Sequence, residues 1–167
     1  DLGLTKMKKL VGGGTMTIVN QTVPRALRNL GYNDAQVTAI VDHINVNRDH
    51  YIDQLKVFLA IPSISALPAH NADTRRCAEW VAAELTRIGL HGARLVETPG
   101  HPVVYAEWLG APGAPTILFY GHYDVQPVDP VNLWESPPFE AAVRDGEIYA
   151  RGAADDKGQV FMHFKAI

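Results

Sequence analysis

The chain has 167 residues, of which 47% are hydrophobic and 20% are charged, and its formal net charge is −3 at pH 7. This composition is that of an ordinary globular protein, and the length suits one domain with a core of its own. The charge balance gives no sign of nucleic-acid or membrane-surface binding, and no apolar run approaches the roughly 20 residues that cross a bilayer.

A single cysteine, Cys77, excludes an internal disulfide and favours a reducing compartment. The first residues lack the basic, apolar and small-residue layout of a signal peptide. We therefore expect a cytoplasmic protein that binds neither nucleic acid nor membranes.

The N-terminal stretch, residues 1–21, is predicted to be irregular apart from a short strand over residues 15–19. Gly12-Gly13-Gly14 indicates a flexible hinge, because the Lys and Ser/Thr of a phosphate-binding loop do not follow at the required spacing. A helix is predicted to begin with Thr22 as its cap and to stop before Gly31.

Two more helices are predicted before residue 62. Asn33 can cap the first of them, and Gln36 stands three residues later, as in a capping box. A separate helix is predicted from about residue 48 to residue 59, where Pro62 ends it. Apolar residues at helical spacing mark the buried face of the first of these helices: Val37, Ile40, Val41 and Ile44.

The rest of the chain alternates between helical and extended patterns. A helix is predicted from Asp73 or Thr74 to just before Gly89. The run 116–120 is almost wholly apolar and predicts a central strand covered on both faces. The other predicted segments are strands at 93–97, 103–108 and 148–150, a long loop at 125–147 and a final helix from Lys157. This order predicts a three-layer α/β domain.

His122 and Asp124 are separated by one residue directly after the apolar run 116–120. In an extended backbone both side chains point to the same side. The carboxylate can orient the imidazole while the other ring nitrogen binds a metal, or the two groups can form an ordinary polar contact in a turn. Taken alone, the pair leaves both interpretations open.

Asp155 and Asp156 follow a glycine-containing turn and precede Lys157-Gly158. Two adjacent carboxylates often begin a solvated helix, because acids in the first turn favour the helix dipole. The alternative is that one carboxylate bridges two divalent ions at the edge of a sheet.

The sequence between the His122–Asp124 and Asp155–Asp156 motifs makes the pair of motifs more specific. It contains, in order, Trp134, Pro137-Pro138-Phe139-Glu140 and Asp145-Gly146. Together with Arg151-Gly152-Ala153 and Asp155-Asp156-Lys157-Gly158, this run resembles the N-terminal catalytic region of the M20 metallopeptidase family, in particular its dipeptidase branch. The resemblance extends over about residues 45–167.

The resemblance implies a zinc-peptidase-like fold and a site for two Zn²⁺ ions, with Mn²⁺ or Co²⁺ as alternatives. His122 would be a terminal ligand to one metal, Asp155 would bridge both metals, and Asp124 would be the catalytic-site residue that orients His122. The Asp155–Asp156 peptide would be cis. The substrate would be a dipeptide or a related small amide.

The same resemblance implies further parts that these 167 residues do not contain, namely a Glu-Glu pair with the general base, another acidic ligand and a distant histidine. We therefore expect an inactive fragment, truncated after the first metal-binding motifs, whose exposed sheet edge favours homo-oligomers. The alternatives are an M20-type deacylase of N-acyl amino acids and a non-catalytic fusion fragment.

Residues 1–44 do not resemble the M20 family, and we predict a domain boundary between them and residues 45–167. Residues from about 10 to 44, including Gly12 to Pro24, resemble a segment of adenosylcobalamin-dependent ribonucleotide reductases. No cysteine lies in this stretch, so it carries none of that enzyme's radical chemistry. It is either a helical extension of the peptidase or one half of a chimera.

Overall fold

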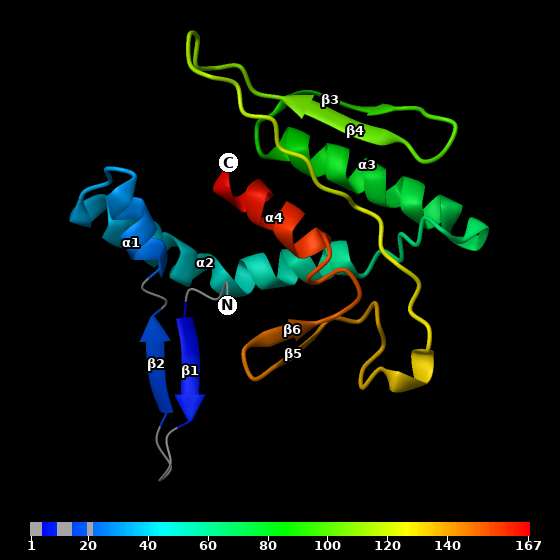
Figure 1. Cartoon of the computed structure of the whole chain (residues 1–167), viewed down its shortest axis with the longest axis horizontal. Coiled ribbons are helices and arrows are strands. Elements are labelled where there is room, and N and C mark those ends of the chain that lie inside the picture. The colour runs from blue at the N-terminus through cyan, green and yellow to red at the C-terminus, as the bar shows by residue number, and fades with distance from the viewer. Residues whose placement is uncertain (1–4, 10–14, 20–21) are drawn as a thin grey trace. The chain divides into compact units, whose positions relative to one another are not determined.

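A computed structural model of the chain describes residues 5–9, 15–19 and 22–167 (Figure 1). The predicted hinge at Gly12-Gly13-Gly14 lies outside these residues. The fold divides into two compact units. One contains residues 53–142 and 148–167, and the other contains residues 143–147 and the described residues up to Ile52. The boundary expected at residues 44/45 remains a prediction.

The N-terminal unit begins with an antiparallel hairpin of β1 (Thr5–Lys9) and β2 (Thr15–Val19), in which Thr5 pairs with Val19. The β2 strand was predicted, whereas the expectation that residues 5–9 are irregular was wrong. Three lysines in this five-residue segment give it a low strand propensity, so only its pairing with β2 identifies it as a strand.

The helix boundaries that follow lie close to the predicted ones. α1 spans Thr22–Asn29, and the N–H of Gly31, a residue with a φ of +93°, donates to the carbonyl of Arg28 at 2.9 Å. Asn33 and Gln36 form the expected capping box. The Gln36 N–H donates to Asn33 Oδ1 at 2.9 Å, and the Asn33 N–H donates to Gln36 Oε1 at 3.0 Å.

α2 is one continuous helix of 26 residues, Asp34–Leu59, where two helices were expected. The break was predicted near residue 48, after two asparagines with weak helix propensity. The side chain of Asn47 instead forms a hydrogen bond within the helix: its Nδ2 donates to the His43 carbonyl, one turn earlier, at 2.8 Å. Neither α2 nor any other helix within the described ranges is long and apolar enough to cross a membrane.

The second unit contains α3 (Asn71–Arg87) and a hairpin of β3 (His91–Val96) and β4 (Val103–Glu107), which packs against α3 (Figure 1). A short 3-10 turn, Pro68–His70, precedes α3 and brings its start two residues ahead of the predicted one. Gly89, with a φ of +96°, follows the end of α3, as expected. Val96 pairs with Val103, and the register is irregular between His91 and Arg94.

The predicted loop at 125–147 contains more structure than expected. A 3-10 turn spans Val131–Leu133, and β5 (Ala142–Arg144) pairs with β6 (Glu147–Tyr149). Asp145 and Gly146 join the two strands, and their φ angles of 51° and 81° are those of a two-residue hairpin turn with positive φ at both positions. The chain then continues into α4 (Lys157–Ala166), at the predicted start.

The core of the second unit lies where the end of α2 meets α3 and α4. Phe58 stacks on Trp80 with ring centroids 4.5 Å apart, and Phe164 lies 6.4 Å from Phe58. The side chains buried here include Phe58, Leu59, Cys77, Ala78, Val81, Phe161 and Phe164. Cys77, with no exposed surface, is therefore a core residue.

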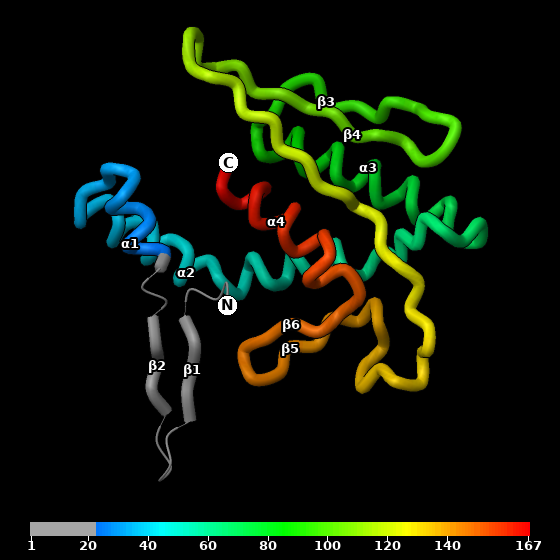
Figure 2. Tube along the Cα trace, viewed as in Figure 1, coloured from blue at the N-terminus to red at the C-terminus, as the bar shows by residue number. Residues whose placement is uncertain are grey.

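The prediction of a central strand at residues 116–120 was wrong. Within the described ranges, strands pair only as the three separate hairpins already given, and this segment belongs to none of them. It runs as an extended trace before residue 121 (Figure 2), with Ile117 73% exposed and Leu118 89% exposed. The apolar composition of this segment is typical of a strand, but the segment is neither paired in a sheet nor buried. Helices and small sheets still give the α/β class that was expected.

The exposed segment 117–120 is predicted to promote self-association of the chain. An uncharged apolar segment with high strand propensity is prone to pair with other chains. The change Leu118→Lys should lower self-association, measured by light scattering after size-exclusion chromatography. It should alter the free energy of unfolding by no more than about 0.5 kcal/mol, because the side chain packs against little. Leu133→Lys, at another leucine that is 74% exposed, is the control. An equal effect of both variants would contradict a specific role of the segment.

A buried carboxylate joins α3 to α4. Glu84, 9% exposed, accepts hydrogen bonds from Arg87 Nη2 at 2.6 Å and from Lys165 Nζ at 2.8 Å. The hydrogen bond from Arg87 contributes most to lowering the pKa of Glu84, and the Lys165 ammonium adds to it. Burial acts in the opposite direction, and the pKa falls from 4.5 to about 2.

The depressed pKa of Glu84 predicts how stability depends on pH. The ionised group stabilises the folded chain above pH 4.5, and this contribution is lost as the pH falls through about 2. The loss is on the order of 3 kcal/mol. Urea unfolding between pH 2 and 7 should show this slope in the wild type and not in Glu84→Gln. The exposed Glu79→Gln is the matched control, and parallel pH curves for wild type and Glu84→Gln would refute the assignment.

Candidate metal site

Gly121 brings the backbone that carries His122 close to the start of α4. A Cβ at Gly121 would stand 2.5 Å from Val160 Cγ2 and 3.2 Å from Asp156 Oδ2, so no larger residue fits without a shift. At this close approach the His122 N–H donates to Asp156 Oδ2 at 3.2 Å. Gly121 thus permits a close approach between this backbone and the start of α4.

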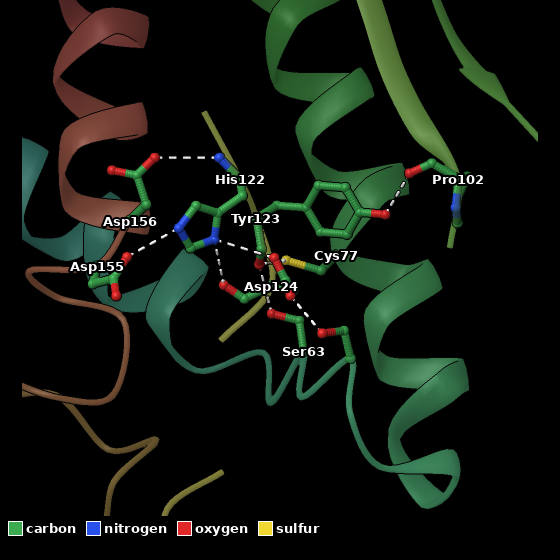
Figure 3. A network of polar contacts seen from close by, with 9 residues as sticks. Ser63, Cys77, Pro102, His122, Tyr123, Asp124, Asp155 and Asp156 are labelled. Atoms are coloured by element: carbon green, nitrogen blue, oxygen red, sulfur yellow. Dashed lines mark hydrogen bonds and ion pairs between the residues drawn. The ribbon is translucent and has the colours of Figure 1, made fainter. Parts of the chain in front are cut away.

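The His122 ring lies between the carboxylates of Asp124 and Asp155 (Figure 3). Its Nδ1 is 3.1 Å from Asp124 Oδ1 and 3.1 Å from the Asp124 carbonyl oxygen. Its Nε2 is 2.9 Å from Asp155 Oδ1. The structure thus brings together all three side chains that the sequence singled out, across 33 residues of chain.

These contacts determine the protonation of the His122 ring. Both acceptors at Nδ1 belong to Asp124, so Nδ1 carries a proton and Nε2 faces Asp155. Burial acts to lower the pKa of His122. The hydrogen bonds to the Asp124 backbone and to the Asp155 carboxylate, together with the charges of Asp124 and Asp156, outweigh burial and raise the pKa above its ordinary value of 6.5. The metal-free site therefore stabilises the imidazolium relative to that of a free histidine.

Two serines hold the loop that carries His122. Ser63 Oγ donates to the Tyr123 carbonyl at 2.7 Å, and the Val125 N–H donates to the Ser63 carbonyl at 2.9 Å. Ser65 Oγ donates to Asp124 Oδ2, the carboxylate oxygen that is not turned toward His122. The side chain of Asp124 is thus fixed from both sides, which in turn fixes the plane of the imidazole.

The turn that carries Asp155 closes on itself before α4. The Gly158 N–H donates to the Gly152 carbonyl at 3.3 Å, and a Cβ at Gly158 would collide with the Ala153 carbonyl oxygen. The Asp155–Asp156 peptide is cis, as the family resemblance implied. Asp156 faces the His122 backbone, whereas the Asp155 side chain is 77% exposed and faces the ring.

The donor set fits two ligands of a zinc ion. A tetrahedral zinc bound to an imidazole nitrogen and a carboxylate oxygen keeps the two atoms roughly 3.4 Å apart. His122 Nε2 and Asp155 Oδ1 are 2.9 Å apart, and Asp155 is exposed enough to rotate by the difference. The carboxylate at Nδ1 is the arrangement that commonly orients a metal-bound histidine.

A complete set of ligands is not formed by this part of the chain. Across residues 5–9, 15–19 and 22–167, no group of three or more His, Cys, Asp or Glu side chains is arranged to hold a metal ion. Asp124 faces Nδ1 and Asp156 faces a backbone N–H, which leaves His122 and Asp155 as the two available donors. Zinc sites with two protein ligands are incomplete, since zinc takes four ligands.

The other reactive side chains of the second unit point elsewhere. His70 Nδ1 contacts Asp73, and His101 Nε2 contacts the Ser65 carbonyl at 3.0 Å. Burial raises the pKa of the Cys77 thiol, and Cys77 Sγ donates to the Tyr123 carbonyl. The supporting roles of Ser63 and Ser65 were missed. The available signal was their place within residues 45–167, over which the family resemblance extends.

Comparison with known proteins gives a consistent result. The model of peptidase family M20/M25/M40 matches residues 118–167, which include His122, Asp124 and Asp155. The chain is 34% identical over 135 residues to the cysteinylglycine-S-conjugate dipeptidase of Corynebacterium striatum, covering 81% of this chain and 30% of that protein.

Two solved structures extend the similarity to the fold. Human carnosine dipeptidase 1 matches with a TM-score of 0.69 and 32% identity, over 75% of this chain and 29% of the other. An M20 family metallo-carboxypeptidase from Sulfolobus solfataricus matches with a TM-score of 0.63 and 40% identity, over 70% of this chain and 26% of the other. The chain thus spans less than a third of the length of each of these relatives.

Proposed function

Because residues 118–167 belong to the M20/M25/M40 peptidase family, and the similarity to its dipeptidases covers most of the chain, we propose that this chain supplies His122 and Asp155 as metal ligands for dipeptide hydrolysis. The observation that carries the proposal is the position of His122, held at Nδ1 by Asp124 and facing Asp155 through Nε2.

The proposed roles of Asp124 and Asp155 follow from these contacts. Asp124 holds the proton on Nδ1 and leaves the Nε2 lone pair for a metal once the second proton is lost. Asp155, being exposed, can present both carboxylate oxygens. When bound, a divalent ion such as zinc polarises a peptide carbonyl and activates water. The three carboxylates around His122 also give the site a negative potential that attracts a cation.

A dipeptide is the substrate class we favour over an N-acyl amino acid. The relatives with the similarities given above include a cysteinylglycine-S-conjugate dipeptidase and a carnosine dipeptidase. The residues next to His122 and Asp155 also contact the site: Tyr123 through its carbonyl and Asp156 through its carboxylate.

Zinc binding tests the two proposed ligands. Isothermal titration of the chain with Zn²⁺ should show weak binding, because two protein donors are available. His122→Ala and Asp155→Asn should each weaken it by about 100-fold or more, beyond the 10–100-fold loss usual for residues that only support a ligand. Matched controls are His91→Ala and Glu140→Gln, at an exposed histidine and an exposed carboxylate outside the site. Equal losses in the controls would show that the binding is not specific to this site.

Turnover tests the second part of the proposal. The general base implied by the family resemblance is absent from these 167 residues, so the chain with added zinc should not hydrolyse Cys-Gly or β-Ala-His at a measurable rate. Amino-acid release, followed by chromatography, is the measurement. Robust turnover that disappears in His122→Ala would show that these residues contain a complete active site and would overturn this expectation.

A further inference from the structure

Lys157 is the most deeply buried charged residue in the described part of the chain, with 0% of its surface exposed. It is the first residue of α4 and comes directly after Asp155 and Asp156. A buried ammonium group is unfavourable unless its donors are satisfied. Its position beside the candidate metal ligands therefore calls for a structural reason.

The donors of Lys157 are satisfied by the backbone at the end of α2. Lys157 Nζ donates to the Ile61 carbonyl at 2.7 Å and to the Phe58 carbonyl at 3.0 Å, across almost 100 residues of chain. Nζ also lies 5.0 Å from the centre of the Phe58 ring, within the range of a cation–π contact. These carbonyls lie at the end of α2, where each also accepts one local backbone N–H: that of Ile61 at 3.4 Å for Phe58 and that of Ser63 at 2.9 Å for Ile61. The Lys157 ammonium is therefore a second donor to each of them.

The segment from Phe58 to Ser65 therefore contacts both halves of the candidate site. Through Ser63 and Ser65 it holds the loop of His122 and Asp124. Through the carbonyls of Phe58 and Ile61 it holds Lys157, which is two residues from Asp155. The two halves are thus positioned against one common piece of buried backbone.

The turn between Gly152 and Gly158 transmits the position of Lys157 to Asp155. The turn is closed by the Gly158 N–H to Gly152 carbonyl hydrogen bond, so its residues move together. A Cβ at Gly152 would lie 2.7 Å from Val125 Cγ1 and 3.4 Å from Lys157 Cδ, so the glycine lets the turn approach both side chains. The Asp155 side chain, 77% exposed, has few contacts of its own that could fix it.

We propose that Lys157 is a positioning residue that sets the distance between His122 and Asp155, by fastening the Asp155 turn to the backbone segment that also holds His122. Its significance for metal binding rests on the proposed function, whereas the geometric role does not. Lysine suits this role because its ammonium presents three donors at the end of a long apolar stem.

The test compares two lysines of α4. Lys157→Met keeps the length of the stem and removes the donors. Lys165→Met does the same at the other end of the helix, where Lys165 pairs with Glu84 at 2.8 Å and is 13% exposed on its side chain. Both variants should lower the melting temperature. In the metal-free chain at one fixed pH, long-range ¹H–¹⁵N spectra should show shifted His122 ring signals in Lys157→Met and unchanged signals in Lys165→Met.

Zinc titration is the second readout, and Lys157→Met should weaken binding about 10-fold or more while Lys165→Met leaves it unchanged. A folded Lys157→Met with wild-type His122 signals would overturn the inference. Should Lys157→Met fail to fold, Lys157→Gln, which keeps a donor for one carbonyl, gives the same comparison and the same overturning result. If the wild type binds no zinc, the proposed function is wrong, and the His122 signals still decide the role of Lys157.

Discussion

The candidate site depends on one short and largely buried stretch of chain, from Phe58 to Ser65, at the end of α2. Phe58, Leu59 and Ser63 have no exposed surface, and Ile64 is 2% exposed. Hydrogen bonds to this segment form away from water, where they are stronger and where an unsatisfied partner is more costly. The loop with His122 and the turn with Asp155 are both attached to it, and neither lies in a sheet within the described residues.

Local sequence patterns predicted the helix ends well, but they missed the continuity of α2 and the absence of a neighbouring strand beside residues 116–120. The Asn33–Gln36 capping box is a four-residue signal, and the structure forms it as expected. The helix break expected near residue 48 was wrong, because propensity values take no account of the hydrogen bond by which Asn47 supports its own helix. Residues 116–120 have the composition of a buried strand, yet composition does not reveal whether a neighbouring strand is present.

Some residues of the candidate site could likewise be predicted from the sequence, and others could not. The spacing of His122 and Asp124 predicted their contact, and the family resemblance related them to Asp155, 33 residues away, which the structure places against the ring. Ser63, Ser65 and Lys157 could not be identified in this way. Each acts on a partner about 60 to 100 residues distant, and several of those partners are backbone carbonyls, which every residue possesses. A sequence pattern carries no trace of which carbonyl a side chain will reach.

The raised pKa of His122 has one more consequence. With carboxylates on both sides of the ring, the metal-free site holds the second proton of the imidazolium more tightly than a free histidine does. A metal ion can bind Nε2 only after that proton leaves, so metal uptake is an exchange of one cation for another. Acidity and metal thus compete for a single lone pair, and the same carboxylates that attract the metal also retain its competitor.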